Sequence, residues 1–178
     1  LHCGNERIFV HNEHLCIGES ELKFNLSRIN ESAGNKYPEF EGIEDRMHLL
    51  LVPCANPDGT YAGINDERAT SKTAFGRCTA EHIDINRDFG NFKAQESVYL
   101  RNYIQKYNPN IYVDCHGWLD EVLGNKEVGS IFVNEFNLSI TKYNQYPYEY
   151  GYVYAWVNKH ITTKSVLLEF KNSQSADV

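Results

Sequence analysis

Three histidines occupy places in the sequence where a catalytic zinc ion could be held. His11 and His14 lie three residues apart after the short apolar run 7–10, and His116 follows the apolar run 111–115. Neutral imidazole is a common zinc ligand, and catalytic zinc sites combine three protein ligands with one open position. We therefore predict a zinc site formed by these three side chains. The alternative is that each is an ordinary polar loop histidine.

A carboxylate lies inside the last apolar run of the chain. Glu169 is flanked by Leu167, Leu168 and Phe170, and burial of a carboxylate is unfavourable unless it has a partner or a function. Desolvation raises the pKa of a carboxyl group, which suits a general base that moves a proton from water to a leaving amine. We predict this role for Glu169. Because side chains alternate along a strand, the alternative is that it faces solvent.

A third group of residues could bind an anionic substrate. Arg77 stands alone, and Asn86 and Arg87 are adjacent at the end of an expected strand. A guanidinium group binds a carboxylate through two parallel hydrogen bonds, and a neighbouring amide can complete the contact. This pattern favours binding of a terminal carboxylate. The alternative is that Asp84 and Asp88 simply pair with these arginines.

The elements that must position these residues alternate between strands and helices. Apolar periodicity predicts strands over residues 7–10, 47–54, 111–115 and 165–170, and helices over residues 15–32 and 96–107. This order predicts an α/β fold with a mixed, mostly parallel sheet flanked by helices. In such sheets, ligands gather beyond the carboxyl ends of the strands. Both His11 and His116 fall at such ends.

Length and composition narrow the class of protein. A chain of 178 residues, 42% hydrophobic and 23% charged, predicts a single domain over residues 1–178. The net charge of -7 and the scattered basic residues argue against nucleic-acid binding. No apolar run approaches the roughly 20 residues of a membrane span. The five cysteines contain no C-x-x-C pair and leave the compartment open.

Taken together, these segments resemble the zinc carboxypeptidases related to carboxypeptidases A and B. The resemblance covers about residues 9–170, and its segments follow the family order: Asn56-Pro57-Asp58-Gly59, Arg77, Asp84-Ile85-Asn86-Arg87-Asp88-Phe89, Asp114-Cys115-His116-Gly117, Gly151, Trp156 and Leu168-Glu169-Phe170. It implies a carboxypeptidase-like fold shortened at both ends, either trimmed or part of a longer chain.

The resemblance also implies roles in catalysis. His116 would be the third zinc ligand and Glu169 the general base. Arg77 would polarise the scissile carbonyl group and hold the developing oxyanion, where a fixed positive charge is most effective.

For substrate binding, the resemblance implies four further residues. Asn86 and Arg87 would bind the terminal carboxylate of the substrate. Tyr146, followed by Pro147, is similar to the mobile tyrosine that closes over the substrate in this family, and Tyr148 fits nearly as well.

The first ligand pair departs from the family pattern, which is His-x-x-Glu. Here His11-Asn12-Glu13-His14 has histidine in place of glutamate, or glutamate one position early. Three-histidine zinc sites are chemically sound. A second candidate pair is His2 and Glu6. We favour His11 and His14, because a helix is predicted directly after them.

The sequence thus predicts a zinc carboxypeptidase that hydrolyses the terminal peptide bond of a peptide or cell-wall peptide with a free carboxylate. Two alternatives remain. One is an inactive carboxypeptidase-like domain that binds peptide termini, which the irregular ligand pair motivates. The other is an aspartoacylase-like zinc deacylase, which shares the zinc and Asn-Arg pattern; the turn at residues 56–59 favours the peptidase.

Overall fold

The structure of the chain is a computed structural model that describes residues 6–12, 47–52, 54–59, 61, 77–117, 120–142 and 148–170. Its elements are β1 (Glu6–Asn12), β2 (Met47–Val52), the 3-10 helix η3 (Ile85–Arg87), α4 (Gln95–Tyr107), β3 (Ile111–Gly117), β4 (Glu121–Gly124), α5 (Lys126–Phe136), β5 (Ser139–Lys142), η4 (Tyr148–Tyr150), α6 (Val153–His160) and β6 (Lys164–Phe170). Within these ranges, no helix has the length and hydropathy needed to span a bilayer.

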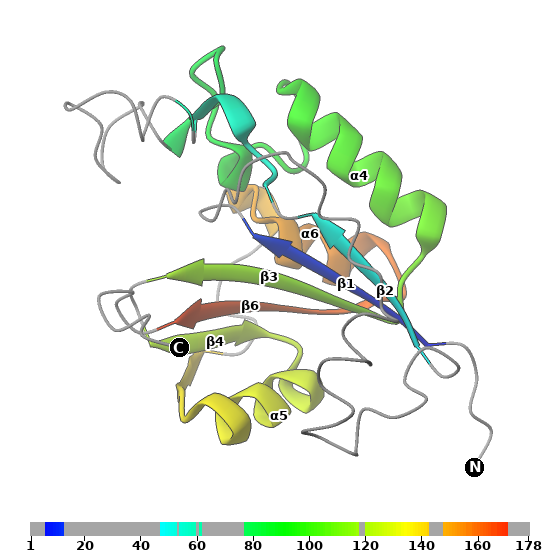
Figure 1. Ribbon diagram of the computed structural model, residues 1–178, viewed down its shortest axis with the longest axis vertical. Helices are drawn as coiled ribbons and strands as arrows, with labels where there is room; N and C mark the ends of the chain where they lie inside the picture. Colours follow the sequence, from blue (N-terminus) through cyan, green and yellow to red (C-terminus); the bar gives the residue numbers. More distant parts are fainter. Residues whose placement is uncertain are drawn as a thin grey trace, which may run out of the picture.

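The six strands form one mixed sheet in the order β2-β1-β3-β6-β4-β5. Strands β2, β1, β3 and β6 run parallel, whereas β4 is antiparallel to β6 and pairs with a parallel β5. The predicted mixed, mostly parallel sheet flanked by helices is confirmed (Figure 1). The carboxyl ends of β1, β3 and β6 therefore meet at one edge of the sheet.

Helices cover both faces of this sheet, with α4 and α6 on one side and α5 on the other (Figure 1). Side chains that alternate along β3 separate the two cores. Tyr112 packs in a cluster with Ile104 of α4 and Val157 of α6. Val113 packs in a second cluster with Val128 of α5. The two clusters hold β3 at the centre of the molecule.

The long predicted elements are confirmed with small shifts of their ends, as β1, β2, α4, β3 and β6. The predicted helix over residues 15–32 lies outside the described residues. The sequence did not predict β4, α5, β5 or α6. Strands β4 and β5 have four residues each, which is too short for a period of two to stand out.

The start of α4 is fixed by the buried carboxylate of Asp88. Its Oδ1 accepts the N–H of Lys93 at 3.0 Å and its Oδ2 accepts the N–H of Ala94 at 2.8 Å. These bonds satisfy backbone donors just before the first helical turn. The helix ends at Asn108, whose φ is 41°, directly before Pro109. Asp88 therefore joins the segment that carries Asn86 and Arg87 to α4.

Candidate active site

Two of the three predicted histidines lie on neighbouring strands at the carboxyl edge of the sheet. His11 is the second-last residue of β1 and His116 the second-last residue of β3, as predicted. The register of β1 and β3 places His11 beside Asp114, two residues before His116. Glu6 lies at the opposite, amino end of β1. His14, like His2 and Glu13, lies outside the described residues.

His116 is held by a buried carboxylate on its own strand. Its Nε2 lies 3.0 Å from Oδ1 of Asp114. The histidine is 8% exposed and Asp114 is fully buried. Histidines that bind metals commonly have their second ring nitrogen hydrogen-bonded to a carboxylate, which fixes the ring orientation. The arrangement is therefore suited to a metal ligand, although Asp114 was not given a role from the sequence.

Glu169 lies directly beside His116 in the register of β3 and β6. On its other side, it pairs with Glu121 of β4, a buried residue that the sequence reasoning missed. Residues paired across neighbouring strands share one face of a sheet. Glu169 is half-buried, rather than directed fully to solvent. An acid and a histidine thus stand side by side where the parallel strands end.

Asp84 connects Arg77 to the Asn86–Arg87 pair. Arg77 Nε donates to Asp84 Oδ2 at 2.7 Å, and the N–H of Asn86 donates to Asp84 Oδ1 at 3.0 Å. The alternative that Asp84 pairs with an arginine is confirmed for Arg77. For Asp88 it is wrong, because both its oxygens accept backbone N–H groups of residues 93 and 94.

Asn86 and Arg87 lie on η3, so the expectation of a strand end is wrong. The physical reason is the Asp84 side chain, which caps the backbone and starts a 3-10 turn. Asn86 is 6% exposed, and its Oδ1 has no hydrogen-bond partner in the described part of the chain. Arg87 is exposed, its Nη1 donates to the Asn86 carbonyl at 2.7 Å, and its guanidinium lies 4.3 Å from the Tyr152 ring centre.

A glycine lets this turn pack against the start of α6. Gly151 has a φ of 78°, and a Cβ there would lie 2.3 Å from the carbonyl carbon and oxygen of Arg87. The N–H of Phe89 donates to the Gly151 carbonyl at 3.2 Å. Since α6 packs on β3 and β6, these contacts join η3 to the strands that carry His116 and Glu169.

Of the two tyrosines predicted to close over the substrate, Tyr148 begins η4 and Tyr146 lies outside the described residues.

Among the described residues, no group of three His, Cys, Asp or Glu side chains could hold a metal ion. Cys54 is disulfide-bonded, whereas Cys78 and Cys115 are free. Burial, with a smaller effect of Asp114, raises the pKa of Cys115 to about 12, so its thiol is neutral at pH 7. Of the three histidines predicted to bind zinc, His116 is the one whose side chain is described, with Asp114 as its partner.

Solved structures of metallo-carboxypeptidases share this fold. A metallo-carboxypeptidase from Burkholderia cenocepacia superposes with a TM-score of 0.64 at 18% identity, over 94% of this chain and 48% of that one. Carboxypeptidase A from Helicoverpa armigera gives 0.61 at 14% identity, over 94% and 53%. Murein-tripeptide amidase MpaA from Escherichia coli O157 gives 0.58 at 17% identity, over 95% and 74%. The predicted carboxypeptidase-like fold is confirmed.

Sequence comparison gives a family and a curated relative. Bacteriocin BCN5 from Clostridium perfringens is 29% identical in an alignment 147 residues long, which covers 70% of this chain and 16% of that protein. The chain thus spans about half the length of the first two structures above and a small part of the bacteriocin. A model of the zinc carboxypeptidase family matches residues 25–165. This match covers most of the chain, which therefore belongs to the zinc carboxypeptidase family.

Proposed function

We propose that residues 1–178 form one carboxypeptidase domain that uses zinc to hydrolyse the terminal peptide bond of a peptide with a free carboxylate. The observation that carries the proposal is the pairing of His116 with Glu169 on neighbouring strands, with buried Asp114 bonded to His116. Family membership supports the reaction class. The similar fold of a murein-tripeptide amidase supports cell-wall peptides as substrates.

The residues present fit a zinc ion with histidine ligands. His116 would be one ligand, and its hydrogen bond to Asp114 is the support that such a ligand needs. His11 and His14 would supply the near pair, with Glu13 as the alternative to His14. Glu6 is a weaker candidate for a zinc ligand, because it lies at the amino end of β1, opposite the edge where His11 lies. When bound, zinc lowers the pKa of a water molecule and polarises the scissile carbonyl group.

Four other side chains would carry out proton transfer, stabilisation of the oxyanion and binding of the substrate carboxylate. Glu169 would take a proton from water and pass it to the leaving amine. Arg77, held at Nε by Asp84, would stabilise the negative charge that develops on the carbonyl oxygen. Asn86 and Arg87 would bind the terminal carboxylate. Because a carboxylate accepts hydrogen bonds, Asn86 would contact it through its Nδ2 donor, and the buried Oδ1 without a described partner would accept only from an N–H or O–H group.

Tyr146 or Tyr148 would close over the bound substrate. An aromatic ring in that position excludes water from the reacting bond, and its hydroxyl group provides a hydrogen-bond donor.

The test is hydrolysis of a peptide with a free terminal carboxylate, compared with the same peptide blocked as an amide. The wild-type chain should release the last residue only from the free peptide. The Glu169→Gln variant should lose turnover by a factor of at least about 100, the lower range for a positioned proton-transfer group, and still bind the peptide. Glu135→Gln, an exposed change on α5, is the matched control. Wild-type turnover in Glu169→Gln would remove the base assignment.

A second candidate is a domain that binds peptide termini without cleaving them. His14 at the position of the family glutamate favours it, as does the ion pair that occupies Arg77 Nε. Elemental analysis separates the two proposals. About one zinc per chain supports the enzyme, whereas binding of the free peptide without stoichiometric zinc supports the binding domain.

A further inference from the structure

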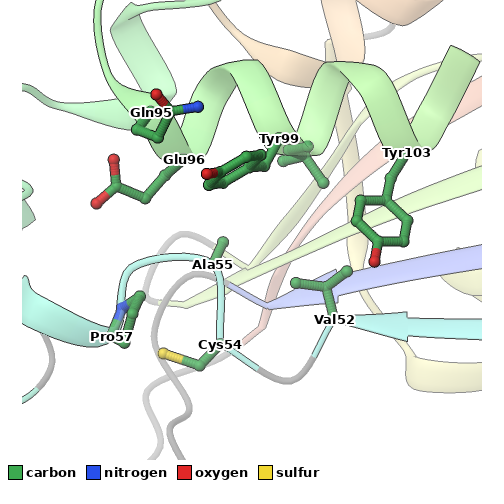
Figure 2. A pocket seen from close by; sticks show the side chains of 9 residues that line it. Val52, Cys54, Ala55, Pro57, Gln95, Glu96, Tyr99 and Tyr103 are labelled. Atoms are coloured by element: carbon green, nitrogen blue, oxygen red, sulfur yellow. The ribbon is translucent and has the colours of Figure 1, made fainter.

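A pocket of about 360 Å³ lies between α4 and the chain that leaves β2. Figure 2 shows Glu96, Tyr99 and Tyr103 of α4 across from Val52, Ala55 and Pro57. The volume lies within the range of small-ligand sites. The disulfide-bonded Cys54 also lines the pocket. No role proposed so far uses this pocket.

The walls of the pocket are mainly apolar and aromatic. Tyr99 is 59% exposed and Tyr103 is 51% exposed, although both rings border the cavity. Exposed apolar surface that is gathered in one patch marks interaction sites and ligand-binding grooves, whereas singly scattered apolar residues are ordinary. Tyrosine rings attract cations over their faces, and they also pack against aliphatic chains.

One carboxylate supplies the polar end of the pocket. Glu96 lies in the first turn of α4, and its Oε2 is buried without a hydrogen-bond partner in the described ranges. Burial raises the pKa of Glu96. Its own backbone N–H lowers this pKa, and nearby acids raise it further, namely Glu81, Asp58 and Asp88. The helix N-terminus explains an acid at this position, but it does not explain the cavity or the tyrosines.

The charges around Glu96 are thus acidic, and its neighbours in the pocket are aromatic. A cation on a flexible aliphatic stem is complementary to both features. A purely apolar ligand would remove water from the partly exposed Glu96 carboxylate without offering it a hydrogen bond, which is unfavourable. An anion would be repelled by the acidic groups.

From this cavity, its two tyrosines and the Glu96 carboxylate that borders it, we infer that the pocket binds a lysine-type side chain of a peptide. The ammonium group meets Glu96, and the alkyl stem lies against Tyr99 and Tyr103. The lining of this pocket shares no residue with η3, where the terminal carboxylate is proposed to bind.

Two blocked amino acids test the inference, with binding followed by ligand-observed NMR titration in the presence of a metal chelator. Nα-acetyl-lysine methylamide carries the cation, and Nα-acetyl-norleucine methylamide has a neutral stem of similar length. Both lack a terminal carboxylate, so neither addresses the proposed catalytic site. The lysine compound should bind at least about tenfold more tightly, which is about 1.4 kcal/mol. Equal affinities, or no binding of the lysine compound, would overturn the inference.

Variants locate the binding. Glu96→Gln should bring the two affinities to within about twofold, and Tyr99→Leu should weaken the lysine compound by about threefold or more, the loss expected for a cation–π contact. Glu135→Gln and Glu169→Gln should leave the preference unchanged, which separates this site from the proposed function. Unaltered preference in both Glu96→Gln and Tyr99→Leu would refute the location, with thermal unfolding as the check that each variant is folded.

Discussion

At the scale of single residues, Asp114 ties the candidate ligand His116 to the sheet. We predict that Asp114→Asn lowers zinc affinity by about 10–100-fold, the usual effect of losing a carboxylate partner of a ligating histidine. Competition with a chromogenic chelator measures the affinity. Asp58→Asn, an exposed change in the short helical stretch after β2, should leave the zinc affinity unaltered. Equal zinc affinity in Asp114→Asn and wild type would show that the hydrogen bond does not support a ligand.

The thiol of Cys78 reports the charges around Arg77 and Asp84. Burial and Asp84 raise the pKa of Cys78 above its ordinary value of 9.0, whereas Arg77 lowers it. Only the thiolate reacts with iodoacetamide, so the alkylation rate should rise with an inflection above pH 9.0. Asp84→Asn should move this inflection to lower pH, and Arg77→Gln should move it to higher pH. Peptide mapping by mass spectrometry follows this cysteine alone.

The raised pKa of Cys78 also determines how the stability of the folded protein changes with pH. Because the folded-state pKa of Cys78 lies above 9.0, the unfolded chain loses its proton first as the pH rises. Stability from this group is fully present below pH 9.0 and is lost above it. An inflection at or below pH 9.0 in the folded protein would contradict both the burial of the thiol and the effect of the Asp84 charge on it.

The site was partly predictable at this scale. Asp114 and His116 are two residues apart on a strand and so share one face, which is a signal that the sequence contains. The joint contact of Asp84 with Arg77 and Asn86 depends instead on the tight turn of η3. Residue types suggested that ion pair only as an alternative, and they did not reveal the turn.

At the scale of elements, Gly151 governs the approach of η3 to α6. Gly151→Ala should reduce the free energy of unfolding by about 1–2 kcal/mol for the left-handed backbone and by about 1–3 kcal/mol for the clash with Arg87. Gly90→Ala is the matched control, since its φ is 115° but nothing lies within 4 Å of the new Cβ. It should show only the backbone effect. Urea unfolding measures both, and equal losses would mean that the contact with Arg87 is not tight.

Elements were predicted where the pattern was long and uniform. Residues 111–115 and 165–170 are mainly apolar, with Asp114 and Glu169 as their charged members, and such segments are typical of buried parallel strands. Helix α4 repeats its apolar residues at helical spacing. The order of the strands was not predictable in detail. It depends on which faces of β3 and β6 the helices α5 and α6 cover, which is a matter of tertiary packing.

At the scale of the whole molecule, the candidate ligands come from strands far apart in the sequence. His11 and His116 are separated by 105 positions, and they are brought together only by the pairing of β1 with β3. The unfolded chain does not preserve this arrangement. A metal that binds only the folded chain stabilises it in proportion to its affinity.

We therefore predict that zinc raises the thermal unfolding midpoint and that a chelator reverses the rise. At a free zinc concentration 100 times the dissociation constant, the stabilisation should be about 2.7 kcal/mol. His116→Ala should abolish the zinc-dependent shift, because it removes a ligand. Glu169→Gln should keep it, because a general base is not a ligand. If Glu169→Gln lost the shift while His116→Ala retained it, the two assigned roles would be exchanged. If zinc moved neither variant nor wild type, the binding-domain proposal would hold, and the register of β1, β3 and β6 would serve recognition of the peptide terminus alone.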